Sequence, residues 1–115
     1  MSPKETVERY LKELIDKIKV FDIVIEDRAE FYELQKELEM MQSDCVKVIK
    51  DLTYKDYYKG PTKDTIHTGE FWEFGKKIKK AEVYIKINKG LPNKRVICIS
   101  FHKAKFSMTF PLINK

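Results

Sequence analysis

Four side chains that can move protons or hold phosphate stand in runs of alternating apolar and polar residues in the second half of the chain. They are a carboxylate, a phenol, an ammonium and an imidazole: Glu73, Tyr84, Lys86 and His102. Metal-free RNA cleavage needs such groups, because the 2′-hydroxyl must lose a proton, the leaving 5′-oxygen must gain one, and the phosphorane needs nearby cations. On one shared surface, these side chains would form a candidate RNA-cleaving site.

The alternation predicts that the four side chains do share one face of a sheet. In AEVYIKIN (81–88) the apolar face consists of Val83, Ile85 and Ile87. In VICISFH (96–102) the apolar face consists of Ile97, Ile99 and Phe101, and the polar face of Cys98, Ser100 and His102. A turn is predicted between the two runs, at Gly90, Pro92 and Asn93. The two strands should therefore pair as an antiparallel hairpin.

Matching the apolar faces of this hairpin makes specific polar residues neighbours. Tyr84 and Lys86 then lie on the same side as His102. The aromatic residues on either side of Glu73 should pack in the core, which turns Glu73 toward Tyr84. A different interpretation stays open, because the outward residues of a half-exposed sheet are normally polar and lysine beside glutamate is an ordinary cross-strand pair.

Three helices should precede the sheet. SPKE (2–5) has the form of a capping box with proline at the first helical position, and a buried stripe follows at helical spacing: Val7, Tyr10, Leu11, Leu14, Ile15 and Ile18. FDIVI (21–25) predicts a short strand. Asp27 should cap a second helix whose buried stripe is Phe31, Leu34, Leu38 and Met41. A third, short helix should begin at Ser43 and Asp44 and point Cys45, Ile49 and Leu52 inward.

The predicted fold is therefore α+β, with N-terminal helices packed on a twisted antiparallel sheet. One domain should span residues 1–115, mainly helical over 1–52 and mainly antiparallel sheet over 71–112, with FSMTF (106–110) as the last strand. The stretch DYYKGPTKDTIHTGEFWEF (56–74) enters this sheet. Its first four residues should end the helical part and bring Lys59 to the sheet, and residues 60–69 should form a mobile lip that carries His67. Taken singly, His67 is also typical of a turn and Lys59 of a solvated surface.

Charge and composition narrow the class of protein. Residues 1–44 hold seven basic and twelve acidic side chains, whereas residues 45–115 hold sixteen basic and six acidic ones. A basic half of this strength favours a polyanion such as nucleic acid, although a lysine-rich surface kept soluble by mixed charge explains it as well. No apolar run approaches the roughly 18 residues of a membrane span, and the N-terminus has no signal-peptide core, so a cytoplasmic protein is expected. Cys45 and Cys98 lie in separate apolar runs, so no disulfide, metal site or small-molecule cofactor is expected.

An ordered set of short motifs in the second half resembles the MqsR family of type II toxins. The set is TYKDYYKG (53–60), HTGEFWEFG (67–75), EVYIKI (82–87), VICISFH (96–102) and a closing FPL (110–112). The resemblance covers roughly residues 44–112, and the first 43 residues match only as a helix, a strand and a helix. It implies a fold similar to RelE-type toxins. It also implies an mRNA interferase, an endoribonuclease that cleaves messenger RNA and arrests growth until a cognate antitoxin masks it.

The resemblance also assigns roles to individual residues. The family's functional lysine falls on Lys59 and its functional tyrosine on Tyr84. Where the family pattern has glutamine this chain has Glu73, and where it has lysine this chain has His102. Both departures introduce a group that can exchange a proton.

The expected mechanism combines these roles with those of neighbouring side chains. Glu73 or His102 would act as general base on the 2′-hydroxyl. Lys59 and Lys86 would stabilise the phosphorane, and Tyr84 would position the phosphate or protonate the leaving oxygen. Further RNA contacts are expected from Lys86, His67, Tyr58 and Lys63, with bases stacking on exposed aromatic rings.

Two other functions stay open. The basic half could serve a non-catalytic RNA-binding or translation-associated protein, or it could meet only an acidic protein partner. The toxin hypothesis predicts mRNA and a cognate antitoxin as partners, and it leaves the part played by the ribosome undecided. It predicts no membrane partner.

Overall fold

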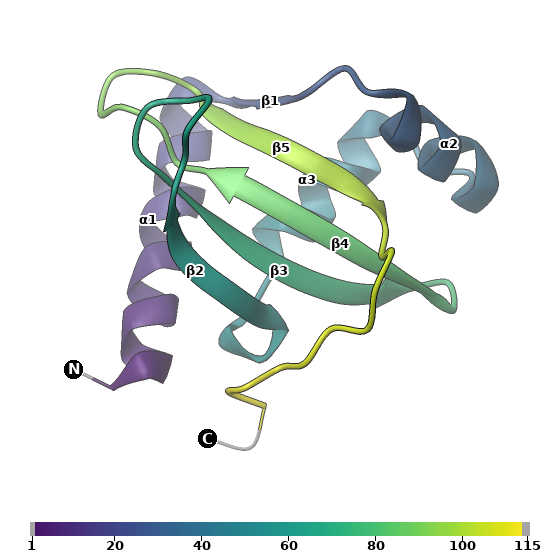
Figure 1. The fold of residues 1–115 in the computed structure, drawn as a ribbon. Coiled ribbons are helices and arrows are strands. Elements are labelled where there is room, and N and C mark those ends of the chain that lie inside the picture. Colours follow the sequence, from purple (N-terminus) through teal and green to yellow (C-terminus); the bar gives the residue numbers. More distant parts are fainter. Residues whose placement is uncertain (1, 114–115) are drawn as a thin grey trace.

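The computed structural model describes residues 2–113, which form three helices packed on one face of a five-stranded sheet (Figure 1). The elements follow one another as α1 (Pro3–Phe21), β1 (Ile23–Ile25), α2 (Ala29–Leu38), α3 (Gln42–Lys50), the 3-10 turn η1 (Tyr54–Asp56), β2 (Tyr57–Lys63), β3 (Glu70–Ile78), β4 (Ala81–Asn88) and β5 (Val96–Lys103). The predicted α+β class is confirmed. No helix within residues 2–113 is long and apolar enough to cross a membrane.

Helix α1 begins where the sequence predicts. The Ser2 hydroxyl accepts a hydrogen bond from the Glu5 backbone N–H at 3.2 Å, and the Glu5 carboxylate accepts from the Ser2 backbone N–H at 3.3 Å. These two hydrogen bonds confirm the predicted capping box. Proline is also at the first helical position, where its missing N–H costs no hydrogen bond. The buried face of α1 packs aromatic side chains against the sheet, with the Tyr10 ring stacked on Trp72 at 4.2 Å between centroids.

The ends of α2 and α3 differ from the prediction. Asp27 does not cap α2: the N-cap residue is Arg28, and the Asp27 carboxylate instead accepts a hydrogen bond from the Tyr32 hydroxyl. Helix α2 ends at Leu38 because Glu39 adopts a left-handed conformation. This turn buries Met40 and leaves Met41 71% exposed, so the assignment of Met41 to the buried stripe was wrong. Met41 is the N-cap residue of α3, and its backbone N–H donates to the Asp44 carboxylate at 2.8 Å.

The sheet is mixed rather than antiparallel throughout. Its strand order is β1-β5-β4-β3-β2, in which β1 runs parallel to β5 and the other neighbours are antiparallel. FDIVI does contain a strand, as predicted. Strands β1 and β5 are far apart in the sequence, because α2, α3 and three other strands lie between them. Their parallel pairing is therefore set by the tertiary fold and not by a local turn.

A bulge in β5 changes the faces predicted for its first residues. Lys86 pairs with Ser100 but the next residue of β4, Ile87, pairs with Cys98, so one extra residue stands between them. Cys98 is therefore fully buried in the helix-covered core, and Ile97 is only half-buried opposite Asn88. The prediction had these two residues on the wrong faces. Beyond the bulge, Phe101 lies in the core and His102 on the other face, as predicted.

Residues 57–63 form strand β2, although the sequence predicts a mobile lip from residue 60. Tyr57 pairs with Phe74, Lys59 with Glu73 and Lys63 with Glu70, with register shifts between them. Glycine suits position 60 for two separate reasons: its φ angle is positive, and an added Cβ would lie 3.0 Å from the Trp72 Cα atom. Only residues 64–69 form a loop.

The predicted last strand at FSMTF is absent. Residues 104–113, called the C-terminal segment from here on, leave the end of β5 and run across the sheet on the side away from α3 (Figure 1). The segment meets this open face above Gly75, where an added Cβ would lie 2.6 Å from the Met108 Cε atom. Its alternating apolar residues therefore reflect contact with a sheet face rather than pairing with a strand.

Candidate functional site

The centre of the candidate site is a hydrogen bond between two side chains on the open face of the sheet. The Tyr84 hydroxyl donates to the Glu73 Oε1 atom at 2.5 Å, and both residues are more than nine-tenths buried. Strand register brings them together, because Glu73 pairs with Lys86, two residues beyond Tyr84 on the same face of β4. The predicted approach of Glu73 to Tyr84 is confirmed.

The environment of Tyr84 keeps its phenol protonated. Burial raises the pKa of Tyr84 far above its ordinary value, and the hydrogen bond to the Glu73 carboxylate and the negative charge of Glu73 raise that pKa further. Tyr84 can therefore donate a hydrogen bond at neutral pH. The Glu73 carboxylate accepts this bond through one oxygen, which leaves the other oxygen as an acceptor.

His102 lies beside this pair, at its predicted place on the open face. It is the backbone partner of Tyr84, and the two ring centroids are 5.3 Å apart. The His102 Nδ1 atom lies 2.8 Å from the Lys103 carbonyl oxygen, so Nδ1 carries the hydrogen that is donated to it. The Nε2 atom is then the one that can exchange a proton with a substrate, since it has no hydrogen-bond partner among the described residues.

Two lysines flank Glu73 on the neighbouring strands. Lys59 is the backbone partner of Glu73 on β2, and its Nζ atom lies 5.4 Å from the centroid of the Tyr58 ring. Lys86 is the partner of Glu73 on β4, and its Nζ atom lies 4.5 Å from the centroid of the Phe71 ring. Neither ammonium forms an ion pair among residues 2–113. Both cations are thus available to a phosphate.

An aromatic cluster borders the pair on the side of the C-terminal segment. The Phe106 ring lies 5.8 Å from Tyr58 and 5.6 Å from Tyr84, measured between centroids, and Phe106 is 47% exposed. Tyr58 therefore lies at the predicted site, but Phe106 occupies part of its ring surface. The sequence pattern did not reveal this contact, because FSMTF resembled an ordinary strand.

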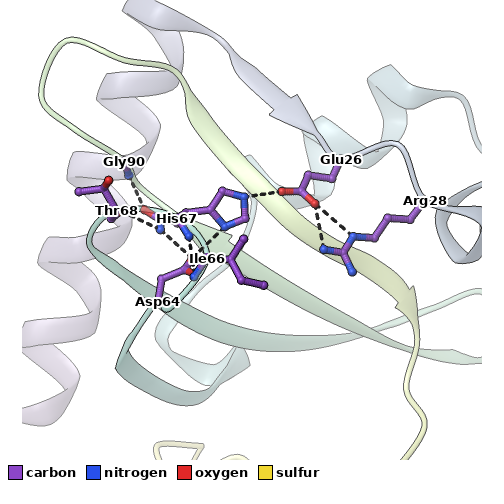
Figure 2. Close-up of polar contacts among 8 residues, drawn as sticks. Glu26, Arg28, Asp64, Ile66, His67, Thr68 and Gly90 are labelled. Atoms are coloured by element: carbon purple, nitrogen blue, oxygen red, sulfur yellow. Dashed lines mark hydrogen bonds and ion pairs between the residues drawn. The ribbon is translucent and has the colours of Figure 1, made fainter.

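His67 lies in a second polar cluster, on the loop between β2 and β3 (Figure 2). Its Nε2 atom lies 2.7 Å from Glu26 Oε1, and its Nδ1 atom lies 3.1 Å from Asp64 Oδ2. Both ring nitrogens thus face carboxylates, and neither is left for a substrate. The structure does not bring His67 to the Glu73–Tyr84 pair.

Asp64 is the centre of this second cluster. One of its oxygens accepts from the backbone N–H groups of Ile66 and His67 at 2.9 and 2.8 Å, and the other accepts from the Asn88 side-chain amide at 3.0 Å. Burial acts to raise the pKa of Asp64, but these hydrogen bonds and the neighbouring imidazole outweigh it and lower the pKa to about 2. The cluster ties the loop to β4 and, through His67, to the residue after β1.

The signal for this cluster in the sequence was weak. Asp64 is an Asx-type residue in a Gly- and Thr-rich turn, which indicates backbone capping, but Asn88, which binds Asp64, and Glu26, which pairs with His67, are distant in sequence. Lys63, the remaining predicted RNA-binding residue, is exposed at the end of β2 opposite Glu70. Within residues 2–113, no group of three or more His, Cys, Asp or Glu side chains is arranged to hold a metal ion.

Comparisons with known proteins leave the family undetermined. No protein-family model matches the chain, and neither a curated protein nor a solved structure matches it.

Proposed function

We propose that this protein is the toxin of a type II toxin–antitoxin system, similar to the MqsR family and with a RelE-like fold, and that it cleaves mRNA in the cytoplasm. The motif resemblance supports the family, and one structural observation supports the chemistry. That observation is the buried hydrogen bond from Tyr84 to Glu73, which lies beside an imidazole with a free Nε2 atom and between two unpaired lysines. A carboxylate in this setting is a general base next to cations that can hold phosphate.

The proposed reaction needs no metal or cofactor. Glu73 takes the proton of the 2′-hydroxyl, and the 2′-oxygen then forms a bond to the adjacent phosphorus. The bond from phosphorus to the 5′-oxygen breaks, and His102 in its doubly protonated, imidazolium form supplies the Nε2 proton to that oxygen. The products are a 2′,3′-cyclic phosphate and a 5′-hydroxyl. Lys59 and Lys86 offset the negative charge of the phosphorane, and the protonated Tyr84 donates a hydrogen bond to Glu73 or to the phosphate.

A second candidate function is RNA binding without cleavage. The observation that favours it is the burial of the pair: Glu73 is 8% exposed and Tyr84 is 7% exposed, and each satisfies the other. A pair of this kind is also a stable way to bury a carboxylate in a sheet. In this alternative, RNA would contact only the lysines and aromatic rings around the pair.

The proposed toxin requires a cognate antitoxin, because an uncontrolled mRNA interferase would arrest its own cell. The acidic half supports a separation of tasks, in which α1 and α2 scaffold the sheet or contact the antitoxin while the basic half meets RNA. The contribution of the ribosome can be measured by comparing free and translated mRNA as substrates.

Cleavage of a mixed-sequence single-stranded RNA in the presence of EDTA tests the proposal. Wild-type protein should release fragments that end in a 2′,3′-cyclic phosphate, detected by mass spectrometry. Tyr84→Phe should bind the RNA with unchanged affinity but cleave it far more slowly. Tyr10→Phe is a matched control, because it also removes a buried phenol oxygen, one with no hydrogen-bond partner among residues 2–113.

Two results would decide against cleavage. If wild-type protein binds the RNA and leaves it intact, and Lys59→Ala weakens binding, the non-catalytic alternative holds. If the wild-type protein shows no RNA binding even at low salt, the basic half meets a protein instead. Growth arrest on expression of the wild type, relieved by Tyr84→Phe, is the expected cellular result.

A further inference from the structure

The C-terminal segment lies on the open face of the sheet through side chains at alternate positions. Phe106 contacts the rings of Tyr58 and Tyr84, and Met108 and Phe110 meet the sheet at Gly75. Gly75 is the backbone partner of Tyr84, so all these contacts fall on or beside the proposed catalytic pair. Further along, Leu112 is 5% exposed and belongs to the main core, which anchors the end of the segment.

Few directional bonds hold the segment between its two ends. The Ala104 backbone N–H donates to the Glu82 carbonyl at 2.8 Å, and Lys105 forms an exposed ion pair with Glu30. Between residues 105 and 112, the only backbone hydrogen bond within the described chain joins Ile113 N–H to the Phe110 carbonyl, inside the segment itself. A strand in the same place would add a ladder of such bonds. The segment can therefore lift without breaking the sheet.

The face beneath the segment is complete without it. Tyr84 and Glu73 are joined by their own hydrogen bond, and the strand pairings of β3, β4 and β5 do not involve residues 104–113. Phe106 covers aromatic surface on Tyr58, and a nucleobase stacks on such a ring about as well as a phenyl group does. RNA could thus replace the contact that it displaces.

We propose that the C-terminal segment is a movable cover over the Glu73–Tyr84 pair, and that it must lift before RNA reaches the two side chains. The part of this proposal that concerns RNA rests on the proposed function, whereas the cover itself does not. In the closed state Phe106 shields Tyr84, which keeps the protein less active than its catalytic groups allow. In the open state the rings of Tyr58 and Tyr84 meet RNA.

Two substitutions should weaken the contact between the C-terminal segment and the sheet, one made in the sheet and one in the segment. Gly75→Ala places a Cβ 2.6 Å from the Met108 Cε atom, 2.8 Å from its Sδ atom and 3.0 Å from the Phe110 Cζ atom, so the ends of both side chains must shift and their contact with the sheet is weakened. The φ angle of Gly75 is not positive, so alanine fits the backbone. Phe106→Ala removes the covering ring itself. Thr109→Ala is the matched control, because it truncates an exposed side chain in the same segment.

Hydroxyl-radical footprinting and RNA cleavage are then measured on the same full-length proteins. Oxidation of Tyr84, read by mass spectrometry, reports its exposure without any need for activity. We expect it to rise about fivefold in Gly75→Ala and in Phe106→Ala, as the loss of one or two ring contacts would produce. The RNA cleavage rate should rise by a similar factor, and Thr109→Ala should behave as the wild type in both measurements.

Each other outcome has a defined meaning. Faster oxidation of Tyr84 with an unchanged cleavage rate would overturn the cover as a control of access. A lower cleavage rate in Phe106→Ala would instead make Phe106 part of the RNA-binding surface, which also overturns the proposal. If no protein cleaves RNA, wild type included, the proposed function fails, and the footprint decides on the cover: unchanged protection of Tyr84 in both variants overturns it.

Discussion

Each of two buried polar clusters contains a carboxylate, Asp64 in one and Glu73 in the other. The two carboxylates differ in how many hydrogen bonds they accept from the protein. Asp64 accepts hydrogen bonds from two backbone N–H groups and an amide side chain, and it also faces an imidazole. Glu73 accepts one hydrogen bond, from Tyr84, and the two lysines nearest to it along the strands form no ion pair in the described part of the chain. Both oxygens of Asp64 accept hydrogen bonds that hold a loop. One oxygen of Glu73 accepts no hydrogen bond from the described residues, and the two lysines on the neighbouring strands form no ion pair there.

This difference separates a structural cluster from a reactive one. A group whose acceptors all bind other groups of the protein stabilises the fold, and a substrate can gain little from it. A buried carboxylate with unused acceptor capacity costs stability unless a ligand supplies the missing partner, as functional sites commonly require. The comparison thus indicates a structural role for Asp64 and is consistent with the chemical role proposed for Glu73, although both are acidic residues in the same stretch of sequence.

The largest expected effect is the loss of RNA cleavage in Glu73→Gln. Glutamine keeps the size of the side chain and can still accept from Tyr84, but it takes no proton from the 2′-hydroxyl. We expect the cleavage rate to fall about 1,000-fold, as for loss of a general base. Single-turnover kinetics with saturating protein measure this rate. Asp64→Asn, the same chemical change in the other cluster, should leave the rate of the folded protein within a factor of about two; equal losses in both variants would erase the distinction.

The next effect concerns stability, for which the Asp64 variant should lose more than the Glu73 variant. Asp64→Ala leaves two backbone N–H groups and the Asn88 amide without their acceptor, so we expect the free energy of unfolding to fall by about 3 kcal/mol. Urea denaturation at neutral pH measures it. Glu73→Gln should lose less than about 1 kcal/mol, because its hydrogen bond to Tyr84 survives. A larger loss for Glu73→Gln than for Asp64→Ala would show that the Glu73–Tyr84 pair is the structural one.

The pH dependence of stability tests the same cluster in a second way. The pKa of Asp64 is about 2 in the folded protein, below its ordinary value of 3.8, so the carboxylate form is favoured by folding. Its contribution is present above pH 4 and is lost as the pH falls from 4 toward 2. We expect a loss of about 2 kcal/mol over this range from Asp64 alone. Urea denaturation at several pH values should therefore show a smaller decrease for Asp64→Ala than for the wild type.

The elements that the sequence predicted correctly are those whose apolar and polar residues follow one unbroken pattern. Helix α1 combines a capping box with an unbroken apolar stripe, and β3 and β4 alternate without interruption, so their faces and the approach of Glu73 to Tyr84 followed from counting residues. Strand β2 was missed because Gly60 and Pro61, which normally end strands, lie within it at a register shift. The bulge in β5 left no mark in the sequence, since Ile97, Cys98 and Ile99 are all apolar enough for either face.

The errors that remain concern contacts between distant segments. Alternating apolar residues in 106–112 are equally consistent with a strand and with an extended segment that lies on a sheet, and only the tertiary structure decides. Of the two carboxylates that face His67, Asp64 is only three residues away in the sequence, whereas Glu26 is brought there by the fold. The positions of the proposed catalytic groups were therefore predictable, but the place of the C-terminal segment above them and the ion pair of His67 with Glu26 were not.

The smallest expected effect is on RNA affinity, and it extends the comparison from the two clusters to the surface around them. Lys63 is exposed at the end of β2, on the basic half, and under the proposed function it would meet RNA only through long-range attraction and one phosphate. Lys63→Ala should weaken binding about threefold and reduce the slope of log affinity against log salt by about 0.7, as loss of one phosphate contact on a single strand does. Fluorescence anisotropy at several salt concentrations measures both quantities.

The matched control is Lys36→Ala, which removes another exposed ammonium, from α2 in the acidic half, and should change neither the affinity nor the slope. Equal effects of the two substitutions would mean that the net charge, rather than the open face of the sheet, attracts RNA.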